Sequence, residues 1–365
     1  MVIMELCEFC NPEGISTGKC HICNNELNKL PEMEKKAEVL LKGCKNFSIS
    51  TLIPKAWLEH EEDIFDFGMD GQESIKSRIN NHLSKILAKK TGCRYARDGE
   101  CKLIFEMRTG NVNLEYNELF VFGRYKKLEA GISQSIWLCK KCSGRGCIKC
   151  DGKGRNYLSI EEIIGKPMKE AADASKFTLH ASGREDVDAT NSAGRPFVIE
   201  LSKAKNREID LNAVKDSINK SGKVSVHDLR IVPREFSEIV TESHFDKEYE
   251  AEVEFDKDMT ENDFKKIDVL QGAILEQRTP ARVAHRRADL VRKRKIIELE
   301  SFVNLHNQRC GTFRILAEAG TYIKELISGD NGRTQPSIAG VLGFGAKCTK
   351  LNVSKIYDCF LDDCK

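Results

Sequence analysis

Four Cys-x-x-Cys pairs constrain this 365-residue chain more than any other feature, because thiols at this spacing favour a metal site over a disulfide framework. The first two pairs are Cys7 with Cys10 and Cys20 with Cys23, and nine residues separate them. That spacer lets two tight turns close a tetrahedron around Zn²⁺. All four ligands would come from the chain, so we expect a structural zinc site here. A redox pair or a chance cysteine-rich tail is the alternative.

The second cysteine group lies in "CKKCSGRGCIKCDGKG", residues 139–154, where only four residues separate the two pairs. This run resembles the CxxCxGxG repeats of the DnaJ chaperone family, in which neighbouring pairs do not share one metal. Gly144 and Gly146 would relax the short turn between the pairs. We therefore expect a possible second zinc site, with exchange of pairs between clusters or an unmetallated loop as alternatives. Its ligands would be Cys139, Cys142, Cys147 and Cys150.

Composition sets the broad class of the chain. It is 40% hydrophobic and 31% charged, which is an ordinary globular balance, and its length allows two or three domains. The longest apolar runs, such as "LFVF", fall far short of the roughly 20 residues of a membrane helix, and the N-terminus has no signal-peptide pattern. We expect a cytoplasmic protein with no membrane association and no obligate protein partner.

Helical and strand patterns divide the chain into four segments of an α+β protein. We expect a zinc-binding head and helical connector at 1–45, then a small α/β module at 46–135 that ends with "NELFVFGRY". A second cysteine-rich insertion occupies 136–158. A mixed, largely antiparallel sheet with helices fills 159–365. The glycine-rich runs fit neither a phosphate-binding loop nor a dinucleotide fingerprint, so we expect no organic cofactor.

A dense basic stretch, "RTPARVAHRRADLVRKRK", begins at Arg278 and contains a single acidic residue. So many positive groups repel one another unless an anion is near, and a nucleic-acid backbone is the simplest such anion. A solvated helix face or loop rim is the alternative. Net charge is only +2, so any nucleic-acid surface must come from local clustering of this kind. The candidate RNA-binding residues are Arg278, Arg282, Arg286 and Arg287.

Three short segments contain candidate catalytic residues. "ASGREDVDATNSAGRPF" at 181–197 offers Asp186, which Arg184 could hold ionised or which could be an ordinary turn residue. "KEYEAEVEF" places Tyr249 at the head of a strand, and "GTYIKEL" places Tyr322 and Lys324 at the start of a helix. Taken singly, each tyrosine is better explained by packing.

Together these segments resemble the pseudouridine synthases. "GRED" has the form that surrounds the catalytic aspartate in several of those families, and "KEY" and "GTYIKEL" look like their second and third motifs. The longer runs, including "RTPARVAHRR" and "GDNGRTQPSI", resemble the archaeal and eukaryotic tRNA pseudouridine synthases that carry an N-terminal zinc and THUMP module. The resemblance is strong over residues 155–365 and looser before them.

The resemblance implies roles for individual residues. Asp186 would be catalytic, Tyr249 would stack on the base, Tyr322 would floor the uridine pocket, and Lys324 would pair with the aspartate. It also implies tRNA as the partner, with T-loop uridines 54 and 55 as targets and the acceptor end held by the N-terminal module. Thr190 departs from the family pattern, where an arginine is expected. The chain shows neither the ATP loop of a thiolation enzyme nor the glycine motif of a methyltransferase; a non-catalytic zinc-bearing RNA-binding protein is the other alternative.

Overall fold

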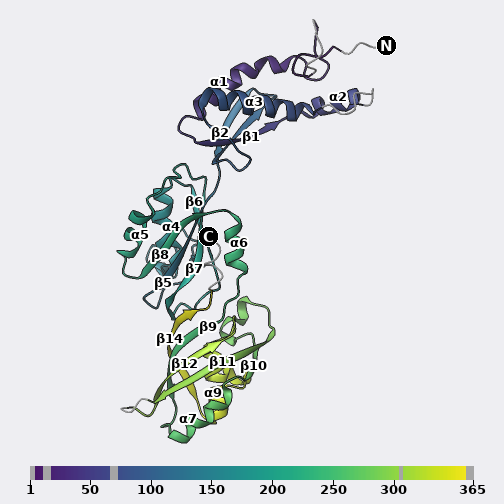
Figure 1. Cartoon of the computed structure of the whole chain (residues 1–365). Coiled ribbons are helices and arrows are strands. Elements are labelled where there is room, and N and C mark those ends of the chain that lie inside the picture. Colours follow the sequence, from purple (N-terminus) through teal and green to yellow (C-terminus); the bar gives the residue numbers. More distant parts are fainter. Residues whose placement is uncertain (1–4, 11–17, 66–72, 304–306, 359–365) are drawn as a thin grey trace. The chain divides into compact units, whose positions relative to one another are not determined.

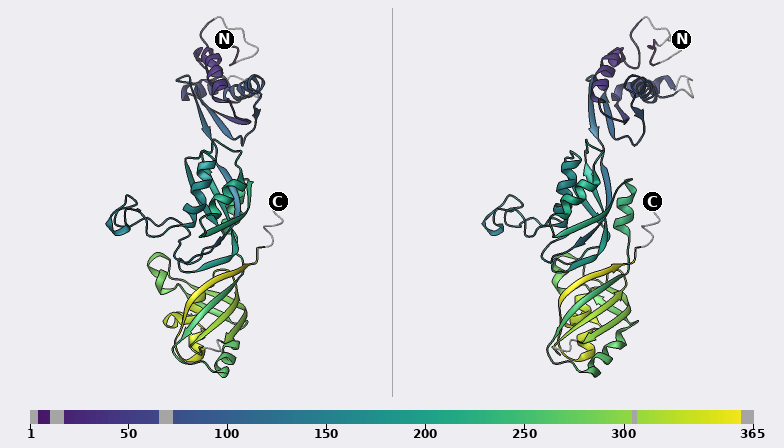
Figure 2. Two further views of the ribbon diagram at one scale, coloured as in Figure 1. Left: turned by 90° about the vertical axis from the view of Figure 1, so that its left-hand side faces the viewer. Right: turned by 60° about the vertical axis from the view of Figure 1, so that its left-hand side comes forward.

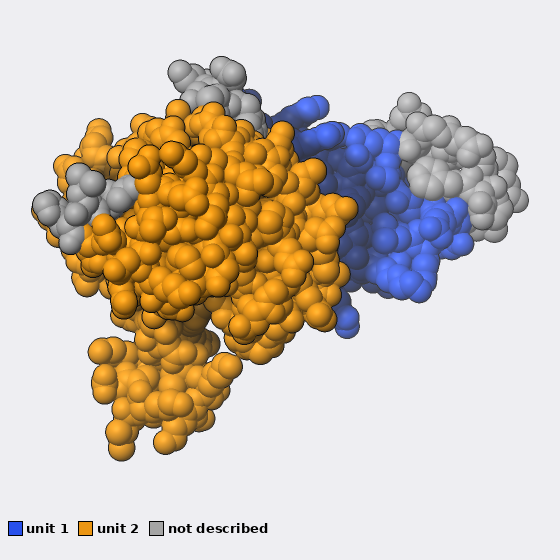
Figure 3. Space-filling view, turned by 90° about the horizontal axis from the view of Figure 1, so that it is seen from below, with its two compact units in different colours: residues 1–119, 202–207 blue, residues 120–201, 208–365 orange. Residues whose placement is uncertain are grey.

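The computed structural model describes residues 5–10, 18–65, 73–303 and 307–358. The chain forms two compact units, which Figure 3 distinguishes by colour. Unit 1 contains residues 1–119 with 202–207, and unit 2 contains residues 120–201 with 208–365. Within the described part of the chain, no helix has the length and apolar character needed to cross a membrane.

Unit 1 is a four-stranded sheet with helices (Figure 1). The strand order is β2-β1-β3-β4; β1 runs parallel to β2 and β3, and β3 is antiparallel to β4. The long helix at Ile75–Thr91 has clear end signals: Ser74 caps its start by accepting from the Ser77 amide, and Gly92 ends it in the left-handed region. The elements are η1 (Glu26–Lys29), α1 (Leu30–Leu40), β1 (Asn46–Leu52), α2 (Lys55–Phe65), α3 (Ile75–Thr91), β2 (Arg94–Tyr95), β3 (Cys101–Glu106) and β4 (Asn111–Tyr116).

Unit 2 is built around a ten-stranded mixed sheet. The path is β13-β10-β11-β12-β9-β14-β7-β5-β8, with β6 beside β7. Its elements are β5 (Leu119–Lys127), η2 (Ile148–Cys150), α4 (Ile160–Ala171), β6 (Lys176–Ala181), β7 (Thr190–Ser202), α5 (Leu211–Asn219), β8 (Val224–Val232), α6 (Glu235–Glu242), β9 (Lys247–Phe255), α7 (Glu261–Ile267), η3 (Asp268–Leu270), β10 (Ile274–Arg278), η4 (Ala281–Arg286), β11 (Val291–Val303), β12 (Cys310–Ala317), α8 (Ile323–Ser328), η5 (Gly329–Gly332), β13 (Thr334–Gln335), α9 (Ile338–Leu342) and β14 (Ala346–Ile356).

Strand β5 departs from the expected segment boundaries. The sequence pattern assigned "NELFVFGRY" to the small module, but β5 pairs antiparallel with β8 in the large sheet. Its first five residues are all buried, as in a strand covered on both faces rather than one with a solvated face. The large sheet therefore takes in chain that lies before the second cysteine group.

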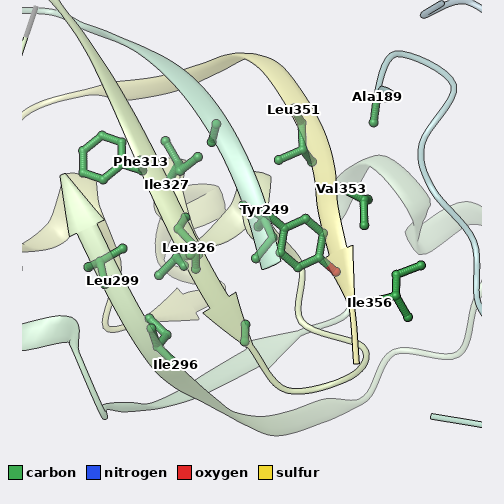
Figure 4. Packing of buried hydrophobic residues seen from close by; sticks show 14 of the residues in the cluster. Ala189, Tyr249, Ile296, Leu299, Phe313, Leu326, Ile327, Leu351, Val353 and Ile356 are labelled. Atoms are coloured by element: carbon green, nitrogen blue, oxygen red, sulfur yellow. The ribbon is translucent and has the colours of Figure 1, made fainter. Parts of the chain in front are cut away.

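The centre of the large sheet is where β14 lies between β7 and β9. β14 is parallel to β7 and antiparallel to β9, so residues from both ends of unit 2 meet here. On β9 the buried residues alternate with exposed ones, and Tyr249 faces the apolar core together with Leu351, Val353 and Ile356 (Figure 4). This core fixes the strand ends from which the functional loops begin.

Candidate active site

The loop that contains Asp186 joins β6 to β7, and its backbone explains the "GRED" sequence. Gly183 has φ +73°, and a Cβ at this position would lie 3.2 Å from Nη1 of Arg195. Only glycine adopts that conformation without strain and leaves room for the arginine. The loop ends at Thr190, beside Asn352 of β14 at the sheet centre.

Two cations from distant segments contact Asp186. Arg282 donates from Nη1 to Oδ1 at 2.8 Å, and Nζ of Lys324 lies 3.5 Å from Oδ2. The sequence had assigned Arg282 to an RNA-binding surface, whereas its guanidinium bonds inward to Asp186 and to the buried Glu325, 2.7 Å from Nε. The expected pairing of Lys324 with Asp186 is present but shared, because Lys324 lies closer to Asp188, at 2.5 Å.

Asp188 is the more exposed of the two carboxylates on Lys324. Partial burial works against its ionisation, but the hydrogen bond and the charge of Lys324 prevail and lower the pKa of Asp188 below its ordinary value. With 73% of its side chain exposed against 28% for Asp186, Asp188 lies at the solvent edge of the cluster. Asp186 lies deeper, between the two cations.

A buried ion pair supports this loop from beneath. Glu185 and Arg195 are both below a tenth exposed, and Nε of Arg195 lies 2.6 Å from Oε2 of Glu185. The Tyr125 hydroxyl donates to Oε1 of Glu185 at 2.9 Å, and Gln134 donates to that hydroxyl at 2.9 Å. Glu185 points into the protein because Arg195 lies in the middle of β7.

Lys127 is a second buried anchor of the loop. Its side chain is almost completely buried, and Nζ donates to the carbonyl oxygens of Asp186 and Val187 at 2.9 and 2.8 Å. Burial lowers the pKa of Lys127 to about 8, although the carboxylates of Glu185, Asp188 and Asp186 act in the other direction. The backbone of the loop is therefore held from β5 at the residue that carries the candidate carboxylate.

A cavity of about 410 Å³ opens beside Asp186, within the range of pockets that hold small ligands. Tyr249 and Tyr322 both line it, and their expected roles as stacking and floor residues of a base pocket stay predictions. Burial raises the pKa of Tyr249 to about 12, so its ring is present as the neutral phenol. The buried Gln277 fixes Tyr322 by accepting from its amide at 2.9 Å and donating to its carbonyl at 3.0 Å.

The remaining arginines of the basic stretch have different environments. Arg287 lines the cavity and donates to the Tyr322 hydroxyl at 2.9 Å. Arg278 pairs with Asp289, the single acidic residue of the stretch. The side chain of Arg286 lies outside the described part of the chain. A role in RNA binding for Arg278, Arg282, Arg286 and Arg287 stays a prediction.

Arg184 and Thr190 are the remaining residues of the Asp186 segment that the sequence singled out. Arg184 is exposed on the rim of the cavity, and its guanidinium carbon lies 5.4 Å from the ring centroid of Trp137. Thr190, where the family pattern has arginine, donates from its hydroxyl to Oδ1 of Asn352 at 3.1 Å. It thereby joins β7 to β14 through a side chain.

Both cysteine groups bring four thiols together. In each group the sulfur atoms lie within 4.8 Å of one another. Tetrahedral zinc with Zn–S bonds of ~2.3 Å places sulfur atoms about 3.8 Å apart, and the measured separations of 3.9, 3.9 and 3.7 Å in the second group fit that distance. The four-residue spacer is thus long enough for the two pairs to face each other, and both groups could hold zinc.

Glycines allow the second group to close. Gly146 and Gly154 follow the two pairs at equivalent positions, each with positive φ, and a Cβ on either would lie within 2.6 Å of a carbonyl oxygen across the loop. Their amides donate to the Cys142 and Cys150 sulfur atoms at 3.2 and 3.3 Å, which are contacts of the kind that orient metal ligands. The repeated CxxCxGxG pattern therefore encodes one four-thiol site.

Comparison with known proteins agrees with this geometry. A family model described as "Pus10, C-terminal" matches residues 120–357. A protein of Korarchaeum cryptofilum named "tRNA pseudouridine synthase Pus10" is 36% identical, over 97% of this chain and 96% of its own length. The protein of that name from Methanothrix thermoacetophila is 39% identical, over 92% of this chain and 76% of its own length.

The solved structures give a weaker likeness. A chain of "Crystal Structure of a Cbf5-Nop10-Gar1 Complex" aligns with a TM-score of 0.33 and 19% identity, over 64% of this chain and 48% of that chain. The sequence relatives by themselves define the class: the chain is a pseudouridine synthase, an isomerase that acts on uridine in RNA. Within that class, the chain belongs to the Pus10 family.

Sequence reasoning missed the residues that support the site. Arg195, Glu185, Lys127 and Gln277 are all buried, and none of them was named as a candidate. One signal was available: "AGRPFVI", residues 193–199, places a single arginine among apolar residues, where an unpaired charge would be too costly. Its partner could not be inferred, because it lies on a loop rather than at a fixed helical or strand spacing.

We predict that Arg195→Met lowers the free energy of unfolding by roughly 3–5 kcal/mol, because it leaves the buried Glu185 without its partner. Urea denaturation measures this change. Arg184→Met, which alters the exposed neighbour of Glu185, should change stability by less than about 0.5 kcal/mol. Equal small effects of both substitutions would mean that the ion pair does not stabilise the fold.

The lowered pKa of Lys127 predicts a pH-dependent contribution to stability. Between about pH 8 and its ordinary value of 10.5, the unfolded chain holds more protons on this side chain than the folded chain. Its contribution to the free energy of unfolding therefore rises with pH across that window. The stability gap between the wild type and Lys127→Met should be wider at about pH 9.5 than at about pH 7. Lys126→Met, on the opposite face of β5, should show no such widening.

Proposed function

We propose that this protein isomerises uridine to pseudouridine in the T loop of tRNA, at positions 54 and 55, with Asp186 as the catalytic carboxylate. One observation supports this most directly: Arg282 and Lys324 reach Asp186 from segments about 96 and 138 residues away, beside a cavity lined by two tyrosines. Both cations contact the carboxylate directly, and a carboxylate is a group that can act as nucleophile or base.

The chemistry needs little more than this constellation. The N1–C1′ bond of uridine breaks, the base rotates, a C5–C1′ bond forms, and a proton passes from C5 to N1, with no net oxidation. One carboxylate can serve by attacking the sugar, by attacking the base or by removing a ribose proton, and we leave these routes open. The target must leave its stack, so a pocket with aromatic faces is required. Tyr249 would stack on the base, and Tyr322 would form the floor.

Several finer assignments belong to the same proposal. Unit 1 would act as the THUMP-like RNA-binding module, which we expect to hold the tRNA acceptor end. Arg184 and Arg287, on the cavity rim, would contact phosphates that flank the target, together with Arg278 and Arg286. The eight thiols of the two cysteine groups would bind structural Zn²⁺, which requires reduced cysteines. A cytoplasmic location provides that environment.

Asp186→Asn should lower the rate of isomerisation at least about 100-fold, because the amide cannot act as nucleophile or base. Release of tritium from tRNA labelled at uridine C5 measures the rate, and pseudouridine mapping gives the position. Asp188→Asn is the matched control, because it also replaces a carboxylate that contacts Lys324 with an amide. It should lower the isomerisation rate less than about tenfold, or about 1.4 kcal/mol.

Affinity for tRNA should survive both substitutions, because neither removes a cation. If Asp186→Asn retained wild-type isomerisation, the catalytic assignment would be lost and Asp186 would be a turn residue. If the wild type bound tRNA without isomerising it, the protein would be an RNA-binding relative of the family.

Zinc content tests the two cysteine groups separately. We expect about two zinc ions per chain, one for each group of four thiols. Cys7→Ser and Cys139→Ser should each lower the content by about one ion, measured by atomic emission on the purified protein. Cys348→Ser, outside both groups, should change nothing. Unchanged zinc in Cys139→Ser would remove the second site.

A further inference from the structure

The segments just before and just after the second cysteine group pair antiparallel and form a short stem (Figure 2). Leu138 pairs with Arg155, and amides of Cys139 and Asn156 donate to Gly154 and Trp137 carbonyls at 2.8 and 2.9 Å. Trp137 and Tyr157 contact each other edge to face, with ring centroids 5.6 Å apart. The stem therefore presents two aromatic rings, and Tyr157 is 40% exposed.

These rings lie next to the catalytic loop. Trp137 lines a second cavity of about 220 Å³, together with Val187 and Asp188. This cavity shares Arg184, Asp186, Arg282 and Lys324 with the larger cavity that Tyr249 and Tyr322 line. The four shared residues thus form the wall between two cavities, and Asp186 is accessible from both.

The proposed function places a target uridine in the larger cavity but gives the smaller one no role. RNA backbone links successive nucleotides, so a base next to the target must lie somewhere close to this wall. Unpaired bases bind proteins by stacking on aromatic rings and guanidinium planes. Trp137 and Arg184 supply both kinds of surface, with the guanidinium 5.4 Å from the ring centroid.

A base fits this cavity better than a phosphate does. Two of the three cations that line it contact carboxylates: Lys324 contacts Asp186 and Asp188, and Arg282 contacts Asp186, whereas Arg184 lies against the Trp137 ring. A phosphate would meet both carboxylates at close range, whereas a neutral base meets no such repulsion. The volume is also below the roughly 300 Å³ of typical small-molecule pockets, which suits one base rather than a whole nucleotide.

We propose that Trp137, supported by Tyr157 and Arg184, is the stacking site for one unpaired base adjacent to the target uridine. Trp137 would then help to determine which uridine enters the larger cavity. This inference rests on the proposed function, because it takes the larger cavity as the uridine pocket. It adds a binding site on the stem of the second cysteine group.

The test is a coupling measurement with T-arm hairpin RNA. One neighbour of the target uridine, then the other, is replaced by an abasic nucleotide, and kcat/KM is measured for the wild type and Trp137→Ala. Loss of one stacked base should lower wild-type kcat/KM about tenfold. On intact RNA, Trp137→Ala should have a kcat/KM lower than that of the wild type by a similar factor. When the abasic nucleotide replaces the neighbour that stacks on Trp137, the kcat/KM of Trp137→Ala should fall no further.

Trp137→Phe should restore most of kcat/KM, because it keeps an aromatic face. Ile148→Ala is the matched control: Ile148 is on the same excursion, is 95% exposed and lies outside the lining of both cavities, so its substitution should leave kcat/KM unchanged. Circular dichroism and zinc content of Trp137→Ala should match the wild type, which separates loss of stacking from loss of the stem.

A binding measurement keeps this inference distinct from the proposed function. The base analogue 2-aminopurine at the coupled neighbour should be quenched on binding to the wild type and much less on binding to Trp137→Ala. Quenching without isomerisation would support the stacking site and contradict the proposed reaction. Two results would overturn the stacking site in an enzyme that isomerises the RNA. One is that the losses of kcat/KM from Trp137→Ala and from the abasic nucleotide add at both neighbours. The other is that 2-aminopurine is quenched equally by the wild type and Trp137→Ala.

Discussion

The buried pair of Glu185 and Arg195 is the interaction on which the catalytic loop depends. A guanidinium in the middle of β7 must find a carboxylate, because a lone buried charge is far too costly. Glu185 supplies it from the residue next to Asp186. The neighbouring Asp186 is consequently turned toward the cavity, where Arg282 and Lys324 contact it. One ion pair therefore separates a buried structural carboxylate from a carboxylate that faces the cavity, within two adjacent residues.

The rest of the site is arranged around that loop by the sheet. Lys127 holds the loop carbonyls from β5, and Thr190 ties the start of β7 to β14. β9 brings Tyr249 to the same point, because β9 and β7 both flank β14 at the sheet centre. The parallel contact of β7 with β14 places the Asp186 loop and the tyrosine side by side, although more than sixty residues separate them.

The second cysteine group lies at the end of the stem that carries Trp137. Its four thiols close a stem whose aromatic residues reach the wall that contains Asp186. A metal bound there would stiffen the stem without contacting substrate.

Some of these features were determined by sequence. Thiol spacing predicted the first four-cysteine group and left the pairing in the second open, and the motifs around Asp186, Tyr249 and Lys324 predicted a pseudouridine synthase, because local chemistry and short motifs are written directly in residue order. The tertiary structure decided which cation contacts Asp186, that Glu185 is buried, and that β5 belongs to the large sheet. These outcomes depend on contacts between segments far apart in the chain. No periodicity encodes such contacts, because they arise only when the sheet brings the segments together and buried charges must be paired.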